Sequence, residues 1–488
     1  MPRIDSLAAG PDRIELLTFE ISGLGNRSYL AIADGWAVAV DVQRDLDRVR
    51  RILDERGLRL AAVVETHVHN DYVTGGLALA RHYGASYVVP PGPALRFDAD
   101  RGHDGDSFRA GPLQLQVINS PGHTDAHASY SLHVGQSPAV AAFTGGSLLI
   151  GGTGRTDLLG VDRARSLARE QFRTADRIAR RLPPEARLLP THGFGSFCLA
   201  GKAVASPGDT LADQFRVNPA FLLNEEQFID NLIAGLGPVP AYFPKMAPRN
   251  VAGPDEADLT PPPYLEVPEV ARRAKHGDWV VDVRQRHTFG EQHVPGSISV
   301  DADGALATWV GWTVGVEDPI VVVADDDAQL AYAQRELVRI GIDRLAGAHV
   351  GQFGAASAND TVASARMATF DDLADGLRAG RVSQVIDVRN WAEWRTGHVA
   401  GAIHLPAYEF TADRLARGDL GPEPWLYCGV GFRAAIAASL MERAGQSAVV
   451  VDDSIVVAEH ELDWCTAEYC TTDRCHADQL VRASADGR

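Results

Sequence analysis

The sequence predicts an α/β protein of about three domains, as expected for a chain of 488 residues. Strand-like and helix-like stretches alternate along the chain, a pattern typical of α/β folds. Residues 236–263 are rich in proline and glycine and end in three consecutive prolines, which indicates a domain boundary. Beyond it, two separated motifs recur at one fixed offset, which indicates an internal repeat.

Composition excludes several classes of protein. The chain has 64 acidic and 46 basic residues, a formal net charge of −18, whereas nucleic-acid binding needs a basic face. No apolar run approaches the roughly 20 residues of a membrane helix, and the N-terminus lacks the apolar core of a signal peptide. Five cysteines in so long a chain make no disulfide framework, so we expect a cytoplasmic protein.

The larger domain is predicted over residues 10–250, with strands and helices in alternation. Leu46, Val49, Ile52 and Leu53 lie at helical spacing, and Gly57 is suited to end that helix. The predicted strands cover residues 36–41, 61–65, 113–118, 140–144 and 186–189, and the predicted helices cover residues 45–56, 77–83 and 163–181.

Three loops that follow predicted strands carry histidines. These loops hold His67 and His69 with Asp71, then His123, then His192. Imidazole is the commonest neutral metal ligand, and several imidazoles with a nearby carboxylate suit zinc or iron. A single His-x-His pair would be weak support, but three such loops at strand ends favour a metal site over structural histidines.

The repeat occupies the rest of the chain. Val281-Asp282-Val283-Arg284 returns as Ile386-Asp387-Val388-Arg389, and a His-Val-x-Gly-x-Ile motif at His293 returns at His398. Both offsets equal 105 residues, the difference between 387 and 282 and between 398 and 293. We therefore expect a first repeat over residues 264–354, a linker over 355–366, a second repeat over 367–463, and a tail over 464–488.

The second repeat has a cysteine loop between a predicted strand and an alanine-rich helix. It runs Cys428-Gly429-Val430-Gly431-Phe432-Arg433. A tight glycine-bearing loop before a helix can direct backbone N–H groups at an anion, and a nearby arginine lowers the pKa of a thiol. In the first repeat the position 105 residues earlier is Val323, followed by the acidic residues Asp325 to Asp327, so we expect no sulfur chemistry there.

The His-x-His-x-Asp loop, the Pro-Gly-His-Thr loop at His123 and the Gly-Arg-Thr-Asp stretch at Arg155 resemble the metallo-β-lactamase fold, and within it the persulfide dioxygenases. This resemblance covers residues 10–250 and implies an αββα sandwich. Two positions depart from the family pattern, with Tyr72 in place of a histidine and Gly146 in place of an iron-ligating aspartate. The departures leave the metal's identity open, and Gly146→Asp is expected to strengthen iron binding, provided that the loop tolerates a side chain at this position. Both repeats resemble rhodanese domains.

The resemblance implies a fusion that oxidises a low-molecular-weight persulfide, such as glutathione persulfide, to sulfite and moves sulfane sulfur through Cys428. It implies mononuclear Fe(II), with zinc as the other candidate. The implied metal ligands are His67, His69, His123 and His192, the implied catalytic residues are Cys428 and Asp71, and the implied substrate-binding residues are Arg155, Gly429, Gly431 and Arg433.

Other interpretations stay open at this stage. A zinc-dependent thioester hydrolase would also use a histidine-rich site, and Gly146 with Tyr72 favours a sulfur carrier whose metal site has degenerated. The expected partner is a small thiol or persulfide, without nucleic acid or membrane, and the composition fits a monomer or a homo-oligomer. Cys465, Cys470 and Cys475 lack the spacing of common zinc sites, and Cys198 is expected to be packed in the core.

Overall fold

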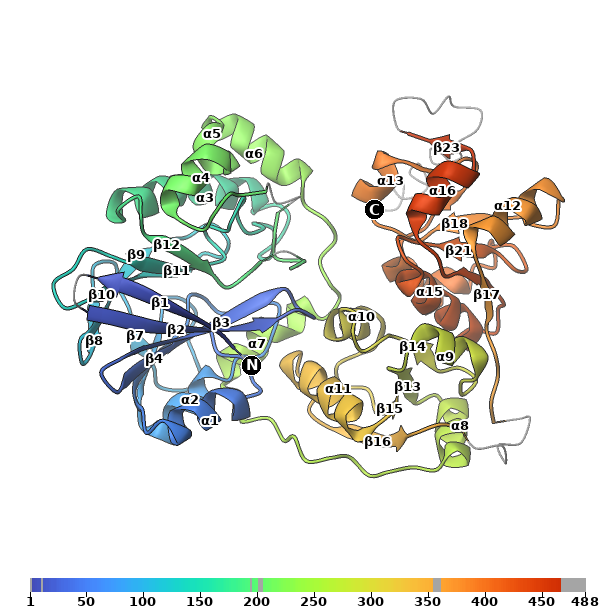
Figure 1. Cartoon of the computed structure of the whole chain (residues 1–488), viewed down its shortest axis with the longest axis horizontal. Coiled ribbons are helices and arrows are strands. Elements are labelled where there is room, and N and C mark those ends of the chain that lie inside the picture. Colours follow the sequence, from blue (N-terminus) through green and yellow to red (C-terminus); the bar gives the residue numbers. More distant parts are fainter. Residues whose placement is uncertain (1, 10–11, 194, 201–204, 354–360, 467–488) are drawn as a thin grey trace. The chain divides into compact units, whose positions relative to one another are not determined.

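The computed structural model describes residues 2–9, 12–193, 195–200, 205–353 and 361–466, and Figure 1 shows the chain. The chain divides into two compact units, one formed by Met1–Asp258 with Leu337–Asp343 and the other by Leu259–Glu336 with Arg344–Arg488. None of the helices in the described part of the chain combines the length and apolar character that crossing a bilayer requires.

The first unit contains two sheets. The first has the order β1-β2-β3-β4-β5-β6-β7, antiparallel from β1 to β4 and parallel from β4 to β7. Its strands are β1 (Arg3–Ala9), β2 (Asp12–Ile21), β3 (Asn26–Ala33), β4 (Trp36–Val40), β5 (Arg59–Val64), β6 (Ser86–Val89) and β7 (Asp100–Arg101).

The second sheet has the order β12-β11-β10-β9-β8. Its strands are antiparallel except for the parallel pair of β11 and β12. They are β8 (Ser107–Ala110), β9 (Leu113–Asn119), β10 (Ala128–Val134), β11 (Ala141–Gly145) and β12 (Arg187–Pro190). The ends of β9 and β12 therefore precede the loops of His123 and His192, as the sequence predicts.

Helices cover the outer face of each sheet, as Figure 1 shows for the blue and green parts of the chain. They are α1 (Asp47–Glu55), α2 (Gly76–Tyr83), α3 (Ala164–Arg181), α4 (Leu211–Val217), α5 (Pro219–Leu222) and α6 (Glu225–Ala234), and α7 (Phe243–Ala252) follows them in the chain. One core joins the two sheets, with Tyr29 and Val64 against Phe143. A second core packs α1 and α2 on the first sheet, and a third packs α3 and α6 on the second. The predicted αββα layering is observed.

The proline-rich stretch 236–263 is more than a boundary. It contains α7, whose Asn250 accepts a hydrogen bond from the Thr74 N–H and donates to the carbonyl oxygens of His69 and Tyr72, each at 2.9 Å. The prolines indicated a domain boundary, but Pro244 lies in the first turn of α7, where a missing N–H costs nothing. The first unit therefore extends to Asp258, and α7 anchors the loop of His67 and His69.

The second unit contains both repeats. In the first, α8 (Val267–His276), α9 (Arg286–Glu291), α10 (Leu306–Thr313) and α11 (Asp327–Arg339) accompany a parallel sheet of order β14-β13-β15-β16. The strands are β13 (Trp279–Asp282), β14 (Ile298–Ser299), β15 (Ile320–Ala324) and β16 (Leu345–Val350). The last residues of α11 cluster with the first unit.

The second repeat has a sheet of order β17-β22-β21-β18-β20 and a small pair, β19 with β23. The strands are β17 (Arg366–Ala368), β18 (Val385–Asp387), β19 (His398–Val399), β20 (Ile403–His404), β21 (Trp425–Tyr427), β22 (Val449–Val451) and β23 (Trp464–Cys465). The helices are α12 (Phe370–Arg378), α13 (Trp391–Thr396), η1 (Ala407–Glu409), α14 (Ala412–Leu415), α15 (Phe432–Arg443) and α16 (Ile455–Glu461). Because β23 pairs with β19, the start of the predicted tail belongs to this repeat.

The internal repeat extends to individual contacts. Arg284 forms a two-point ion pair with Asp282 and donates to the Gln292 carbonyl oxygen, while Arg389 does the same with Asp387 and Gly397. His293 stacks on Phe289 at 3.9 Å between ring centroids, and His398 stacks on Trp394 at 3.4 Å. These equivalent residues lie 105 positions apart, so the two repeats share one architecture.

Candidate metal centre and cysteine loop

Three buried imidazoles converge in the first unit. The nearest ligand atoms of His67, His123 and His192 all lie within 4.8 Å of one another. The Nε2 atom of each ring is buried and has no hydrogen-bond partner among the described residues. Buried polar atoms are normally paired, so three orphaned nitrogens at one point indicate a missing ligand.

The first of these rings is oriented by a carboxylate acting through a hydroxyl. Thr66 donates its hydroxyl hydrogen to Asp41 at 2.8 Å, so the Nδ1–H of His67 donates to the Thr66 oxygen at 2.9 Å. Asp41 also accepts the Thr66 backbone N–H at 2.7 Å and the Thr191 hydroxyl. Asp41 has a left-handed backbone, with φ of 50°, which is uncommon outside glycine. This arrangement leaves the Nε2 lone pair of His67 free for a metal.

The second ring is oriented by the backbone. The Nδ1–H of His123 donates to the carbonyl oxygen of Arg155 at 2.7 Å. Arg155 itself is buried, and its side chain donates twice to Asp157. Its other donors reach the carbonyl oxygens of Phe197, Gly237 and Pro238. All five N–H groups are therefore used within the protein, so the predicted substrate-binding role of Arg155 does not fit, and Arg155 instead fixes the segment that orients His123.

The third ring connects to Asp71. The Nδ1–H of His192 donates to the Asn26 side-chain oxygen at 3.0 Å, and the Asn26 amide donates to Asp71 Oδ2 at 2.8 Å. Asp71 Oδ1 is buried and has no partner among the described residues. Asp71, His69 and His192 form a second group whose ligand atoms lie within 4.8 Å. A carboxylate oxygen therefore lies next to the three-imidazole cluster.

His69, which the sequence placed among the metal ligands, has different neighbours. Its Nε2 lies 3.2 Å from Asp41 Oδ1 and 3.1 Å from Glu65 Oε2. Burial alone would lower the pKa of His69, but the two carboxyls raise it to about 10. The Nδ1 atom of His69 is also buried and has no hydrogen-bond partner among the described residues. The structure thus places His192 in one ligand group with His67 and His123, and in the neighbouring group with His69 and Asp71.

The two departures from the family pattern have clear structural consequences. Tyr72 stacks on His69 with ring centroids 4.3 Å apart and donates its hydroxyl to the Asp41 carbonyl oxygen at 3.1 Å. A Cβ atom at Gly146 would lie 2.2 Å from Cδ2 of His123, closer than real Cβ contacts. The loop therefore lacks room for the side chain that Gly146→Asp would add, because the His123 ring occupies that space, and the condition for stronger iron binding is not met.

Sequence reasoning missed His127. This buried ring stacks on His67 at 4.9 Å between centroids and accepts the Gly146 N–H at its Nε2, 3.0 Å away. Its Nδ1 lies 2.8 Å from the Ser120 hydroxyl and 2.9 Å from that of Ser147. Both ring nitrogens of His127 thus have hydrogen-bond partners, and the ring supports the cluster by packing against His67. Its spacing of four residues from His123 was the available signal.

Burial sets the protonation of the cluster. It lowers the pKa of His123 to about 3, with His192 contributing in the same direction. Burial also holds the pKa values of His67 and His192 below their usual range. Neutral imidazoles are the form that binds metal. The donor set of three neutral nitrogens with one adjacent carboxylate oxygen therefore fits a divalent transition metal.

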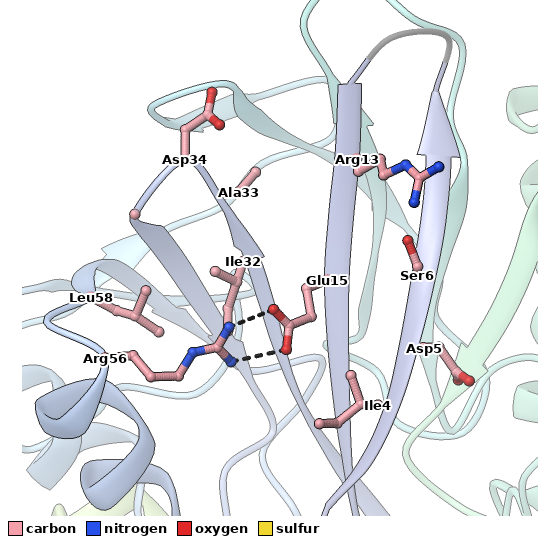
Figure 2. Close-up of a pocket in the computed structure, with 11 residues that line it drawn as sticks. Ile4, Asp5, Ser6, Arg13, Glu15, Ile32, Ala33, Asp34, Arg56 and Leu58 are labelled. Carbon is pink, nitrogen blue, oxygen red and sulfur yellow. Dashed lines mark hydrogen bonds and ion pairs between the residues drawn. The ribbon is translucent and has the colours of Figure 1, made fainter.

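The first unit has hollows on its surface. One, of about 710 Å³, lies over the strands β1, β2 and β3, and Figure 2 shows its Glu15–Arg56 ion pair. Its lining includes no histidine or cysteine. Another, of about 390 Å³, is lined by His192 together with Arg3 and Arg27. The second hollow therefore lies beside the metal cluster, and the first has no evident chemistry.

The cysteine loop connects β21 to α15. Cys428 is buried and directly follows Tyr427, the last residue of β21, and Gly431 has a φ of 86°, which favours glycine. Arg433 forms a two-point ion pair with Glu393 at 2.6 and 2.7 Å. Burial alone would lower the pKa of Arg433, but Glu393 and the nearby Cys428 raise it, so the guanidinium remains a fixed cation.

The strand register places Ala324, not Val323, at the position of Cys428. Val323 pairs with Asp282 as Tyr427 pairs with Asp387. The connection that follows is also shorter by one residue, because α11 begins at Asp327, three residues after Ala324, whereas α15 begins at Phe432, four residues after Cys428. The first repeat therefore lacks both the thiol and the loop that would surround it.

Two further cysteines lie in the described part of the chain. Cys198 is fully buried, as predicted, and Cys465 is half-buried in β23. Cys470 and Cys475 lie outside the described residues.

Comparison with known proteins agrees with this geometry. The Rhodanese-like domain family matches residues 369–458. A metallo-β-lactamase structure from Staphylococcus aureus subsp. aureus COL aligns with a TM-score of 0.61 and 26% identity, covering 70% of this chain and 99% of that one. Persulfide dioxygenase ETHE1, mitochondrial, of Homo sapiens is 30% identical over 195 residues, 40% of this chain and 69% of that protein. Hydroxyacylglutathione hydrolase of Brucella anthropi is 37% identical over 113 residues, 23% of this chain and 42% of that protein.

The fold and the histidine cluster define a metal-dependent enzyme of the metallo-β-lactamase fold that carries a rhodanese-like domain. Within that fold the chain belongs to the family of ETHE1. The family match for rhodanese covers the second repeat alone, so the assignment of the first repeat to that family stays a prediction.

Proposed function

We propose that the protein is a persulfide dioxygenase joined to a sulfurtransferase. The first unit would convert a low-molecular-weight persulfide, dioxygen and water into the thiol, sulfite and two protons. In this reaction the S–S bond of the persulfide breaks, its outer sulfur is oxidised to sulfite, and dioxygen takes up the electrons.

The observation that carries this proposal is the convergence of the three orphaned Nε2 atoms of His67, His123 and His192. Similarity to ETHE1 supports the dioxygenase chemistry. Fe(II) held there would supply the redox chemistry with dioxygen. The protein's own contribution is to fix the three rings through Thr66, Arg155 and Asn26 and to keep them neutral by burial.

The donor set supports iron despite Gly146. Non-haem Fe(II) oxygenases commonly use two histidines and one carboxylate. Asp71 Oδ1 is the unpaired carboxylate oxygen in the neighbouring group of ligands, so Asp71 can provide the negative charge that Gly146 lacks. We therefore assign Asp71 a role beside the metal, together with the three imidazoles.

The hollow beside His192 has a lining of mixed charge. Arg3 is paired with Asp5 and Arg27 with Glu20, and Asp209 also lines the hollow. The lining therefore gives no preference for an anionic over a neutral persulfide.

Sulfur transfer is assigned to the second repeat. The Cys428 thiolate attacks the outer sulfur of thiosulfate, an S–S bond forms at Cys428, and sulfite leaves with the electron pair of the broken bond. The reverse step joins sulfite to the Cys428 persulfide and releases thiosulfate. The fixed Arg433 cation near Cys428 supports an anionic sulfur species in this loop.

Three measurements test the proposal. Anaerobically purified protein should contain Fe, and it should consume dioxygen with glutathione persulfide. His67→Ala should remove both the metal and the activity. Cys428→Ser should abolish thiosulfate:cyanide sulfurtransfer and leave dioxygen consumption intact, so the two halves are tested separately. Absence of Fe, Zn and Mn, even after reconstitution, would instead favour a sulfur carrier.

A second candidate is a zinc-dependent thioester hydrolase. The similarity to hydroxyacylglutathione hydrolase favours it, as does a three-imidazole site, which also suits zinc. Hydrolysis of a hydroxyacylglutathione by the zinc-loaded protein, without dioxygen consumption by the iron-loaded protein, would select this function.

A further inference from the structure

The first repeat contacts the cysteine loop of the second repeat through one arginine. Arg286, the first residue of α9, donates from Nη2 to the carbonyl oxygen of Val430 at 2.9 Å. The same guanidinium donates to Asp452 of the second repeat at 2.6 Å and to Asp301 of its own repeat at 2.8 Å. The Arg286 side chain thus connects the cysteine loop, Asp452 at the end of β22, and the first repeat.

Asp452 in turn packs against the loop backbone. A Cβ atom at Gly431 would lie 2.1 Å from Asp452 Oδ1 and 2.8 Å from its Cα, so only glycine fits between Asp452 and the loop. Gly431 has a φ of 86° and immediately precedes α15. Asp452 therefore limits where the backbone of Gly431 can lie just before α15, and Arg286 holds Asp452 in place by a hydrogen bond.

Phe432, the first residue of α15, also packs on the first repeat. The Phe432 ring lies against Gly304, where a Cβ atom would be 2.5 Å from Phe432 Cζ. The same ring makes an edge contact with Trp309, with centroids 6.3 Å apart. Consecutive residues from Val430 to Phe432 are thus held from the first repeat, directly or through Asp452.

This contact constrains the groups that surround Cys428. The C=O and N–H of a trans peptide point in opposite directions, so binding the Val430 carbonyl to Arg286 turns the Gly431 N–H to the opposite side. At the other end of the loop, the Gly429 carbonyl accepts the Ile455 N–H at 3.0 Å. Backbone N–H groups stabilise a sulfur anion only when their directions are fixed.

We propose that Arg286 is a positioning residue for Cys428, and that the cysteine-free first repeat serves as a brace for the sulfur-carrying loop of the second. This inference rests on the proposed sulfur transfer at Cys428. Arg286 takes no part in the bond changes. Arg286 fixes the conformation of the cysteine loop. Within that loop the Cys428 thiolate forms, attacks sulfane sulfur and becomes the persulfide.

The test compares Arg286→Gln and Arg286→Lys with Arg443→Gln in the full-length protein. Arg443 also joins the repeats, donating to the carbonyl oxygens of Gly277, Asp278 and Gly296 and lying 4.1 Å over the Trp279 ring. Within the described part of the chain, Arg443 makes no contact with the cysteine loop. It is therefore a matched control for loss of inter-repeat contacts.

We expect Arg286→Gln to lower kcat for thiosulfate:cyanide sulfurtransfer by about tenfold or more, since small displacements of reacting groups are costly. Arg286→Lys should recover part of the rate, and Arg443→Gln should stay close to the wild-type rate. The pH profile of Cys428 alkylation by iodoacetamide, followed by peptide mass spectrometry, should shift to higher pH in Arg286→Gln only.

A wild-type rate and pH profile in Arg286→Gln would overturn the inference, as would an equal loss in Arg443→Gln. Failure of the proposed function is distinguishable, because it would appear as absent sulfurtransfer in the wild-type protein or unchanged activity in Cys428→Ser. The alkylation profile tests the brace in either case, since it requires no turnover.

Discussion

His123 donates its Nδ1–H to the carbonyl oxygen of Arg155 over 2.7 Å, and the Arg155 side chain is itself held by every N–H that it carries. The orientation of a metal-facing ring thus depends on a buried ion pair that does not touch the metal cluster. Such outer contacts determine which ring nitrogen is free and where its lone pair points.

Arg155→Gln should therefore release metal without removing a ligand. The substitution leaves Asp157 buried without its ionic partner, which typically costs about 3–5 kcal/mol of stability. We expect a lower metal-to-protein ratio and a lower unfolding temperature for the first unit. Arg163→Gln, which breaks the exposed pair with Asp125, is the control and should change neither quantity appreciably. Full metal occupancy in Arg155→Gln would contradict this role.

Gly146→Asp should weaken metal binding rather than strengthen it. The new Cβ atom would meet the His123 ring at 2.2 Å, so the ring must move away from His67 and His192. Gly146→Ala should show the same loss, because the clash begins at Cβ and does not depend on charge. Gly421→Ala, in the second repeat, is the control, because a Cβ atom there would come no closer than 3.2 Å to its nearest neighbour, the Gln384 side chain. Elemental analysis of the three variants decides, and higher iron content in Gly146→Asp would refute the steric argument.

The first repeat should not become a sulfurtransferase when given a thiol. In a Cys428→Ser background, Ala324→Cys places a cysteine at the equivalent strand end, but only Asp325 and Asp326 separate it from α11. The loop is too short to surround a sulfur anion, and nearby carboxylates repel it. We expect no persulfide at residue 324 by mass spectrometry after incubation with thiosulfate. Restored sulfurtransfer would show that the loop length is not limiting.

Acid should weaken the cysteine loop through Glu393. Burial alone would raise the pKa of Glu393, but Arg433 outweighs it and lowers the pKa below its usual range. A carboxyl with a lowered folded-state pKa stabilises the protein above its unfolded pKa of 4.5 and loses this contribution as pH falls further. The difference in unfolding temperature between the wild type and Glu393→Gln should thus be present at pH 7 and shrink below pH 4.5. A pH-independent difference would argue against the ion pair as its source.

The sequence by itself predicted the order of the domains, the strands and helices of the αββα unit, and the loops that carry His67, His123, His192 and Cys428. These features are local, because hydrophobic periodicity and turn residues indicate an element whatever packs against it. The repeat offset also needed no structure, and the register of β13 with β14 and of β18 with β20 agrees with it.

Only the tertiary structure decided which residues meet. It placed His192 in one ligand group with His67 and His123 and in a second group with His69 and Asp71, while Asp41 and Glu65 engage Nε2 of His69. It showed that every N–H of the Arg155 side chain has a partner and that the His123 ring fills the space beside Gly146. The strand register makes Ala324, rather than Val323, the equivalent of Cys428. It also brought Arg286 to the Val430 carbonyl, 144 residues away in sequence. Contacts of this kind depend on strand register and on the space between side chains, and neither is encoded in spacing along the chain.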